Sequence, residues 1–180
     1  NSFMPLFASQ KEHPVFHLTD GEMEELKLTR QQLEQYPDLK TIHITASSEY
    51  DVKIGSGLLS ALGTELSKVC EIGTAAIISD SNVYPLYGDA AKKSLLDAGL
   101  EVAEYVFPAG EASKNGTTFL ALLNFLAENR LTRSDALIAL GGGVVGDLAG
   151  FAAATYMRGI PFIQIPTTLL AMVDSSVGGK

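Results

Sequence analysis

Residues 136–147 read Ala-Leu-Ile-Ala-Leu-Gly-Gly-Gly-Val-Val-Gly-Asp, and this stretch decides the fold. Its first five residues are apolar, and a run of this length is typical of a buried strand. Glycines follow, and they let a backbone come close to a ligand because they carry no side chain. Residues 144–157 then predict a helix with several small side chains. A strand, a glycine turn and a helix in this order direct backbone N–H groups and the positive helix end at a phosphate.

The turn also has the dinucleotide-binding spacing G-x-G-x-x-G, through Gly141, Gly143 and Gly146. One part of that fingerprint is missing, because no Asp or Glu lies about 20 residues further on to bind a ribose. Residues 165–168 read Ile-Pro-Thr-Thr instead, and the glycines come after at least two other predicted strands. A tight turn with close helix packing and no ligand is therefore the alternative interpretation of the motif alone.

Length and composition indicate one α/β domain of ordinary size. The chain has 180 residues, of which 46% are hydrophobic and 19% charged, a balance that argues against disorder. The net charge of −8 disfavours a nucleic-acid partner, although a few cations in one cleft can still bind an anionic small molecule. A single cysteine, Cys70, cannot form a disulfide within the chain, and no apolar run is long enough to span a bilayer. We expect a cytoplasmic protein without a membrane contact.

Strands and helices alternate along the sequence, which predicts a Rossmann-like parallel sheet flanked by helices. An antiparallel pair of strands is expected near the start, at residues 41–45 and 50–54. Parallel strands are expected at 74–79, 101–107, 136–140 and 161–165, and helices at 58–69, 84–98, 115–129, 144–157 and 169–173. Residues 1–39 differ from the rest and are interpreted as an N-terminal extension or linker with a helix at 22–36.

Polar residues follow the predicted strands where their carboxyl ends should meet. Asp80, Glu111, Gly143 and Thr167 can therefore face one crevice, where α/β sheets hold ligands. Local alternatives exist for each: Asp80 or Ser81 as a helix cap is the favoured local interpretation, and the Glu111 loop resembles a solvated capping box. The convergence of all these loops is what the local alternatives do not explain.

A metal site near the N-terminus is a weaker hypothesis. His13 and His17 are one helical turn apart, which suits a metal on a helix. Pro14 and the lack of a third ligand count against it.

Several motifs together resemble the 3-dehydroquinate synthase family, in its order and at its spacing. They are Pro-Ala-Gly-Glu-Ala-Ser-Lys at 108–114, Gly-Gly-Gly-Val-Val-Gly-Asp at 141–147, Tyr-Met-Arg-Gly at 156–159, Pro-Thr-Thr-Leu-Leu-Ala at 166–171 and Asp-Ser-Ser-Val-Gly-Gly-Lys at 174–180. The resemblance covers about residues 40–180. It implies an NAD-binding N-terminal domain there, truncated at the start of a second, helical domain that carries the metal ligands.

The resemblance also implies roles for individual residues. Asp147 would be the ribose acid that the standard fingerprint lacks, and Lys180 would contact both cofactor and substrate. The other implied cofactor contacts are Asp80 and Asn82 on the adenosine side, Glu111 and Lys114 as further NAD contacts, Gly142, Gly143, Val144, Val145 and Gly146 around the diphosphate, and Thr167 and Thr168 on the nicotinamide side. Arg158, Asp174 and Lys180 would bind the substrate.

The reaction implied by the resemblance belongs to the shikimate pathway, which leads to chorismate and aromatic amino acids. NAD transiently oxidises a hydroxyl of 3-deoxy-arabino-heptulosonate 7-phosphate, phosphate is eliminated, the ketone is reduced again and the ring closes to 3-dehydroquinate. A divalent metal, zinc or cobalt, is expected, with its ligands outside this chain. We expect a homodimer in the full-length enzyme, and this part alone to be inactive.

Three other interpretations remain open at this point. A different sugar phosphate cyclase, of the inosose or valiolone synthase type, would share most of these motifs. A metal-dependent alcohol or glycerol dehydrogenase resembles Gly-Gly-Gly-x-x-x-Asp-x-x-Lys, but Gly150 occupies the final position here. A non-catalytic nucleotide-binding or interaction module is the third.

Overall fold

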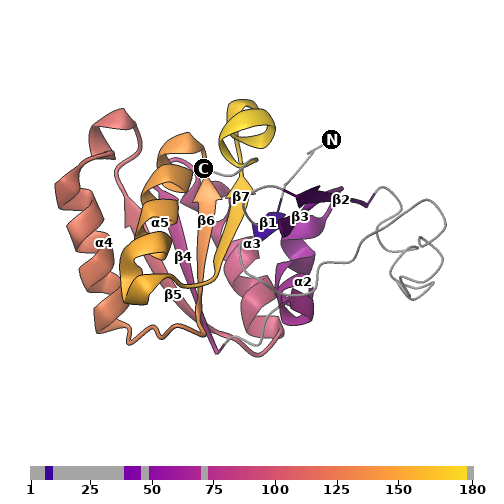
Figure 1. Cartoon of the computed structure of the whole chain (residues 1–180), viewed down its shortest axis with the longest axis horizontal. Helices are drawn as coiled ribbons and strands as arrows, with labels where there is room; N and C mark the ends of the chain where they lie inside the picture. Colours follow the sequence, from indigo (N-terminus) through magenta and orange to yellow (C-terminus); the bar gives the residue numbers. More distant parts are fainter. Residues whose placement is uncertain (1–6, 10–38, 46–48, 70–72, 178–180) are drawn as a thin grey trace.

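The computed structural model describes residues 7–9, 39–45, 49–69 and 73–177. These residues form an α/β fold around one sheet (Figure 1). The seven strands lie in the order β2-β3-β1-β7-β6-β4-β5. The predicted helix at 22–36, the pair His13 and His17, Cys70 and Lys180 lie outside the described residues.

The parallel half of the sheet contains the four strands predicted for it. They are β4 (Thr74–Asp80), β5 (Glu101–Phe107), β6 (Ala136–Gly141) and β7 (Phe162–Pro166). β4 pairs in parallel with both β5 and β6, and β6 pairs in parallel with β7. The chain moves outward from β4 to β5 and then returns to the other side of β4 as β6. The order therefore reverses between β4 and β6, and ligands of open α/β sheets bind at the carboxyl ends of strands at such a point.

Helices cover both faces of the parallel strands (Figure 1). The short helix η1 (Leu58–Ala61), α2 (Leu62–Val69) and α3 (Tyr84–Asp97) pack on one face, where Leu62 and Leu95 meet Ile77 and Ile138. On the opposite face, α4 (Gly116–Glu128) and α5 (Gly143–Thr155) bury Leu122, Leu126 and Ala149 against Ile78 and Leu137. Successive side chains of each strand point alternately into the two cores, as expected for a sheet covered on both sides.

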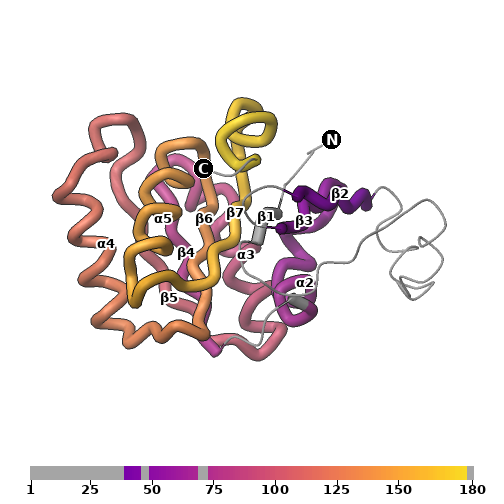
Figure 2. Tube along the Cα trace, in the orientation of Figure 1, coloured from indigo at the N-terminus to yellow at the C-terminus, as the bar shows by residue number. Residues whose placement is uncertain are grey.

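The predicted antiparallel pair is also present, as β2 (Lys40–Thr45) and β3 (Glu49–Ile54). It is joined to β7 through β1 (Phe7–Ser9), which pairs antiparallel with both β3 and β7. The trace in Figure 2 shows this group of strands beyond β7, on the side away from α4. The sequence analysis did not predict β1, because three residues are too few to show a period.

Two helices end differently from the prediction. The helix predicted to reach Met157 ends at Thr155 and continues as a short turn, η3 (Tyr156–Arg158), in which Met157 has a left-handed φ of 52°. The helix after β7 runs on through η4 (Ala171–Ser175), a π-helical turn, although Asp174 was expected to break it. The break fails because Ser176 donates to the carbonyl of Ala171 through its N–H, at 3.0 Å, and its hydroxyl, at 2.5 Å.

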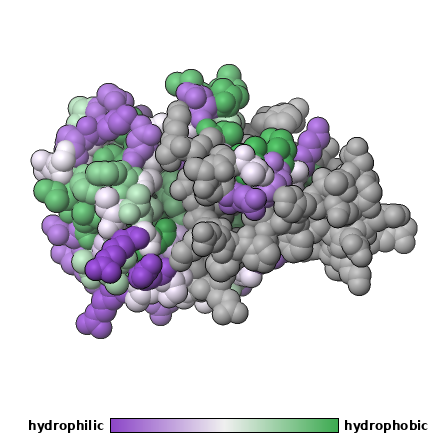
Figure 3. Space-filling model, in the orientation of Figure 1, coloured by the Kyte–Doolittle hydropathy of each residue, from purple (hydrophilic) through white to green (hydrophobic). Residues whose placement is uncertain are grey.

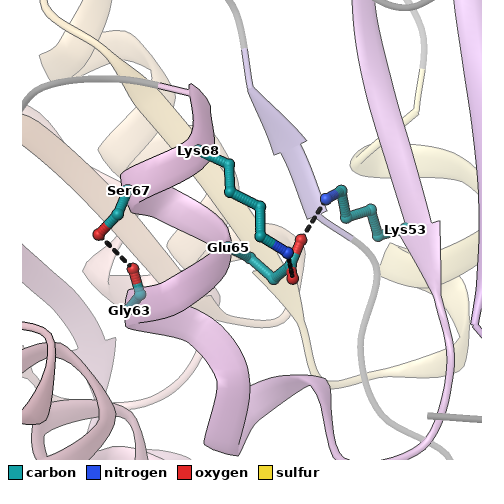
Figure 4. A network of polar contacts seen from close by, with 5 residues as sticks. All are labelled: Lys53, Gly63, Glu65, Ser67 and Lys68. Carbon is teal, nitrogen blue, oxygen red and sulfur yellow. Dashed lines mark hydrogen bonds and ion pairs between the residues drawn. The ribbon is translucent and has the colours of Figure 1, made fainter. Parts of the chain in front are cut away.

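A network of ion pairs ties α2 to the hairpin (Figure 4). Glu65 is buried on α2 and pairs with Lys53 of β3 and with Lys68 on its own helix. Burial alone would raise the pKa of Glu65, but hydrogen bonds and charges from the two lysines outweigh it and hold the pKa below its usual value. In the described ranges, no helix has both the length and the apolar character needed to cross a bilayer.

Candidate functional site

The glycine turn lies at the reversal point of the sheet. Gly141 ends β6, Gly142 is the residue before α5, and Gly143 begins the helix. No side chain caps this end of α5. The first N–H groups of a helix have no partner within the helix, so an uncapped start leaves donors for a ligand.

The glycines serve different purposes. A Cβ at Gly141 would lie 2.4 Å from Cγ2 of Val145, so this glycine is needed for packing between β6 and α5. A Cβ at Gly142 would lie 3.1 Å from Cγ2 of Thr168, and one at Gly143 would lie 3.6 Å from Oγ of Ser175. The segment after β7 therefore comes within side-chain reach of the turn.

Thr167 and Thr168 differ in what their hydroxyls do. The N–H of Thr167 donates to the carbonyl of Gly141 at 2.9 Å, which fixes the residue beside the turn. Its Oγ1 is buried and has no hydrogen-bond partner among the described residues. A buried hydroxyl without a partner is costly, so this atom marks a place where a ligand could donate or accept. Oγ1 of Thr168 instead accepts from the N–H of Ala171 at 3.2 Å and so caps the last helix.

Lys114 links two loops of the site. Its Nζ lies 2.6 Å from Oδ2 of Asp147 and 3.7 Å from Oε1 of Glu111. The hydrogen bond and charge of Asp147, with the charge of Glu111, raise the pKa of Lys114 above its usual value. Lys114 therefore stays charged at neutral pH. The capping-box alternative for Glu111 is wrong, because the cap of α4 is Asn115, whose Oδ1 accepts from the N–H of Thr118 at 3.0 Å.

Asp80 has a local role, but it is not the helix cap that the sequence favoured, because the N-cap of α3 is Val83 and no side chain caps that helix. Its Oδ1 accepts from the N–H groups of Asn82 and Val83, at 2.9 and 3.0 Å, and so organises the turn between β4 and α3. Ser81 was weighed only as a cap, and it does something else: its Oγ accepts from the N–H of Ala109 at 3.0 Å. That bond ties the loop after β4 to the loop after β5. A serine gives no sequence signal for such a contact.

The structure gathers most of the predicted site residues at the carboxyl edge of the parallel strands. Asp174 follows β7 in the helix beside the glycine turn, at Ala171–Ser175. Arg158 is not in this group: it lies beyond the far end of α5, whose 13 residues span about 20 Å. Within the described ranges, no group of three or more His, Cys, Asp or Glu side chains could hold a metal ion.

A shallow cavity adjoins Lys114 and Asp147, between the first turn of α4 and the second and third turns of α5. Its volume is about 360 Å³, and its apolar wall contains Phe119, Leu148 and Phe151. The rings of Phe119 and Phe151 lie 4.7 Å apart between centroids. The sequence analysis had no signal for this cavity, because the two rings come from different helices.

Known proteins share this sequence and fold. Residues 104–180 match the family model described as 3-dehydroquinate synthase N-terminal. The chain is 56% identical over 131 residues to a 3-dehydroquinate synthase of Enterococcus faecalis, covering 73% of this chain and 37% of the relative. It is 51% identical over 132 residues to that of Symbiobacterium thermophilum, with the same coverage. The chain thus spans well under half the length of the curated relatives it matches.

Solved structures of sugar phosphate cyclases are similar to this fold. A 2-deoxy-scyllo-inosose synthase complexed with carbaglucose-6-phosphate, NAD⁺ and Co²⁺ has a TM-score of 0.68 at 29% identity, over 76% of this chain and 37% of that one. A 2-epi-5-epi-valiolone synthase from Streptomyces hygroscopicus, with NAD⁺ and Zn²⁺ bound, has a TM-score of 0.60 at 32% identity, over 68% of this chain and 33% of that one. The glycine turn, the loops around it and these likenesses together place the chain in the 3-dehydroquinate synthase family, of which it carries the N-terminal part.

Proposed function

We propose that the chain is the NAD-binding domain of a 3-dehydroquinate synthase, which converts 3-deoxy-arabino-heptulosonate 7-phosphate into 3-dehydroquinate and phosphate. The observation that carries the proposal is the uncapped start of α5 at the reversal point of the sheet. NAD⁺ in the two similar cyclase structures supports it. The relatives with this name are 48–56% identical, whereas the inosose and valiolone synthases are 29% and 32% identical.

The residues present fit NAD. The backbone N–H groups at residues 142–145 would bind the diphosphate, and the hydroxyl of Thr167, which has no partner among the described residues, gives the nicotinamide side a polar contact. The N–H of Gly146 already donates to the carbonyl of Gly142 at 3.0 Å, so Gly146 would let the cofactor come close without donating to it. Asp147 is 47% exposed at its side chain and would accept hydrogen bonds from ribose hydroxyls, while Lys114 adds positive charge. Asp80 and Asn82 are the proposed contacts on the adenosine side, Glu111 is a further proposed contact of NAD, and Thr168 is proposed beside Thr167 on the nicotinamide side.

Bound NAD would take a hydride from one substrate carbon and later return it, so that the cofactor ends unchanged. The contribution of the chain is to hold cofactor and substrate in register and to keep water from the reacting carbons. Asp174, in the helix beside the turn, and Lys180 are the proposed substrate residues, and Lys180 would pair with an anionic group. The described residues do not form a site for a divalent metal.

The proposal includes a second domain. We propose that residues 40–180 form the cofactor domain, that residues 1–39 precede it as an extension, and that the metal ligands lie in a domain beyond the matched part. We also propose a homodimer that works in the cytoplasm. Arg158 stays a prediction of the resemblance, and Arg158→Ala in the complete enzyme tests it: a substrate KM within twofold of wild type would remove it from the site.

The decisive assay compares substrates. In the complete enzyme, the heptulosonate phosphate should release phosphate and 3-dehydroquinate with no net NADH. Faster turnover of glucose 6-phosphate or sedoheptulose 7-phosphate would instead indicate an inosose or valiolone synthase. Net NADH from glycerol would indicate a dehydrogenase. The dehydrogenase motif has a lysine at the position of Gly150, and here even a Cβ at that position would lie 3.3 Å from the ring of Phe162.

A further inference from the structure

We propose that the β2–β3 hairpin positions residues 171–177, so that the contact between Val177 and the hairpin sets the affinity for substrate and leaves that for NAD unchanged. This inference rests on the proposed function, which gives the hairpin no role.

The hairpin carries a small apolar cluster of its own. Tyr50 and Val52 of β3 are 2% and 3% exposed, and Ile44, Ile54 and Val177 pack against them. The cluster is separate from the two cores that flank the parallel strands. A two-stranded hairpin needs a covered apolar face to be stable, and Val177 supplies part of that cover from more than 100 residues away in sequence.

The register of the sheet shows which face Val177 covers. Val52 aligns with Ala8, and Ala8 aligns with Gln164 of β7, so the three residues form one row across the strands. Side chains in one row project to the same face of a sheet. Oε1 of Gln164 lies 3.2 Å from where a Cβ of Gly146 would be, so this face is the one that α5 covers. Val177 therefore reaches the hairpin on the α5 side of the sheet.

The last helix thus lies between the glycine turn and the hairpin. On one side, Ser175 approaches Gly143, as described above. On the other side, Val177 packs on Tyr50 and Val52. In Figure 1 the yellow helix after β7 stands at the same end of the sheet as the start of α5.

Three apolar side chains of this helix are exposed, whereas Ala171 is buried. Leu169, Leu170 and Val173 are 76%, 69% and 68% exposed, and Figure 3 shows an apolar surface at the top, where Figure 1 shows this helix. The segment is fixed at its start by the cap from Thr168 and at its end by Ser176, which is 3% exposed. Asp174 lies between these points and three residues before Val177, so we infer that loss of the contact between Val177 and the hairpin would shift its carboxylate.

Truncation of the contact tests the inference in the complete enzyme. Val177→Ala removes two methyl groups from the cluster, and Val52→Ala does the same from the opposite side. We expect each to raise the KM for the heptulosonate phosphate at least about fivefold, with a Kd for NAD⁺ within about twofold of wild type. Val106→Ala is the matched control, because Val106 is 43% exposed on β5, at the other edge of the sheet, and should change neither constant. Val177→Ile keeps an apolar side chain that can fill the contact, so its KM for the heptulosonate phosphate should be close to that of wild type and not to that of Val177→Ala.

Other outcomes would overturn the inference. A loss of folded enzyme alone would lower kcat and leave the KM unchanged, and that pattern would show a merely structural role. A Kd for NAD⁺ that rises as much as the KM would contradict the separation of the two affinities.

Hydrogen exchange on the same proteins separates this inference from the proposed function. Amides of residues 171–177 should exchange faster in Val177→Ala and Val52→Ala, while those of α5 should not. Unchanged exchange there overturns the positioning role even if the enzyme makes 3-dehydroquinate. Inactivity of the wild type on the heptulosonate phosphate contradicts the proposed function, whatever the exchange shows.

Discussion

Methyl groups added to the glycine turn should separate its packing role from its binding role. In Gly142→Ala the atoms nearest to the new methyl all belong to Thr168, with Cγ2 at 3.1 Å and Oγ1 at 3.5 Å. Thr168 is exposed, and Gly142 has a φ of −83°, which any residue adopts. We therefore expect the free energy of unfolding to fall by less than about 1 kcal/mol. The methyl would stand where the diphosphate approaches the backbone, and it should weaken NAD⁺ binding at least tenfold, or about 1.4 kcal/mol.

Gly141→Ala should behave in the opposite way. Its methyl would lie 2.4 Å from Cγ2 and 2.6 Å from Cβ of Val145, in a contact that is buried on both sides. Overpacking of this kind costs about 1–3 kcal/mol, and each kcal/mol lowers the Tm by about 2–4 °C in a chain of this size.

Thermal unfolding and calorimetric titration with NAD⁺ on each variant form the assay. Gly143→Ala is the mild control for stability, because its methyl would lie 3.6 Å from Ser175, an ordinary contact distance. Wild-type NAD⁺ affinity in a folded Gly142→Ala variant would refute the reasoning, since the turn could then not be the place where the diphosphate meets the backbone.

The remaining predictions concern single side chains. Thr167→Val removes the buried hydroxyl that has no described partner. It should leave the free energy of unfolding unchanged or raise it by about 1 kcal/mol, and it should weaken NAD⁺ binding. A loss of stability with unchanged NAD⁺ binding would mean that the hydroxyl serves the fold and not the cofactor. Asp135 accepts from the N–H of Thr74 and from the N–H and hydroxyl of Thr132, and these bonds outweigh burial and hold its pKa below the usual 3.8. Its contribution to stability is thus present above about pH 4 and is lost as the pH falls through the lowered pKa, so urea unfolding of Asp135→Asn should depend less on pH below 4 than that of wild type. Glu65→Gln removes the carboxylate that pairs with Lys53, whose side chain is only 17% exposed. The free energy of unfolding should therefore fall by about 2 kcal/mol. No change would mean that the network in Figure 4 adds nothing to stability. Lys180→Ala in the complete enzyme should raise the substrate KM or lower kcat at least tenfold, about 1.4 kcal/mol, and wild-type kinetics would remove Lys180 from the site.

The fold was largely predictable because each parallel strand is an apolar run next to a helix of clear period. Residues 136–140 predicted β6 to within one residue, and the hairpin was predicted from its alternating Ile42 and Ile44. β1 was not predictable, because its place in the sheet comes from pairing with β3 and β7 and not from its own three residues. The end of α5 was missed for a similar reason: the left-handed φ of Met157 has no signal in a residue type that rarely adopts it.

The site was predictable where it follows strand ends. The loops at Asp80, Glu111, Gly143 and Thr167 all leave the carboxyl edge of the parallel strands, as the order of strands and helices implied. Contacts between side chains of different loops were not predictable: the ion pair between Lys114 and Asp147, and the tie from Ser81 to the next loop, depend on distances that no spacing in the sequence encodes.

A calorimetric titration of the complete enzyme with NAD⁺, repeated with ADP-ribose, measures most directly whether the glycine turn holds a dinucleotide. ADP-ribose has the same diphosphate but no nicotinamide. We predict saturable binding of both at one site per chain, with ADP-ribose displaced by NAD⁺ and both weakened at least tenfold by Gly142→Ala. A folded wild-type enzyme that binds neither compound, or a Gly142→Ala variant that binds both as tightly as wild type, would contradict the account.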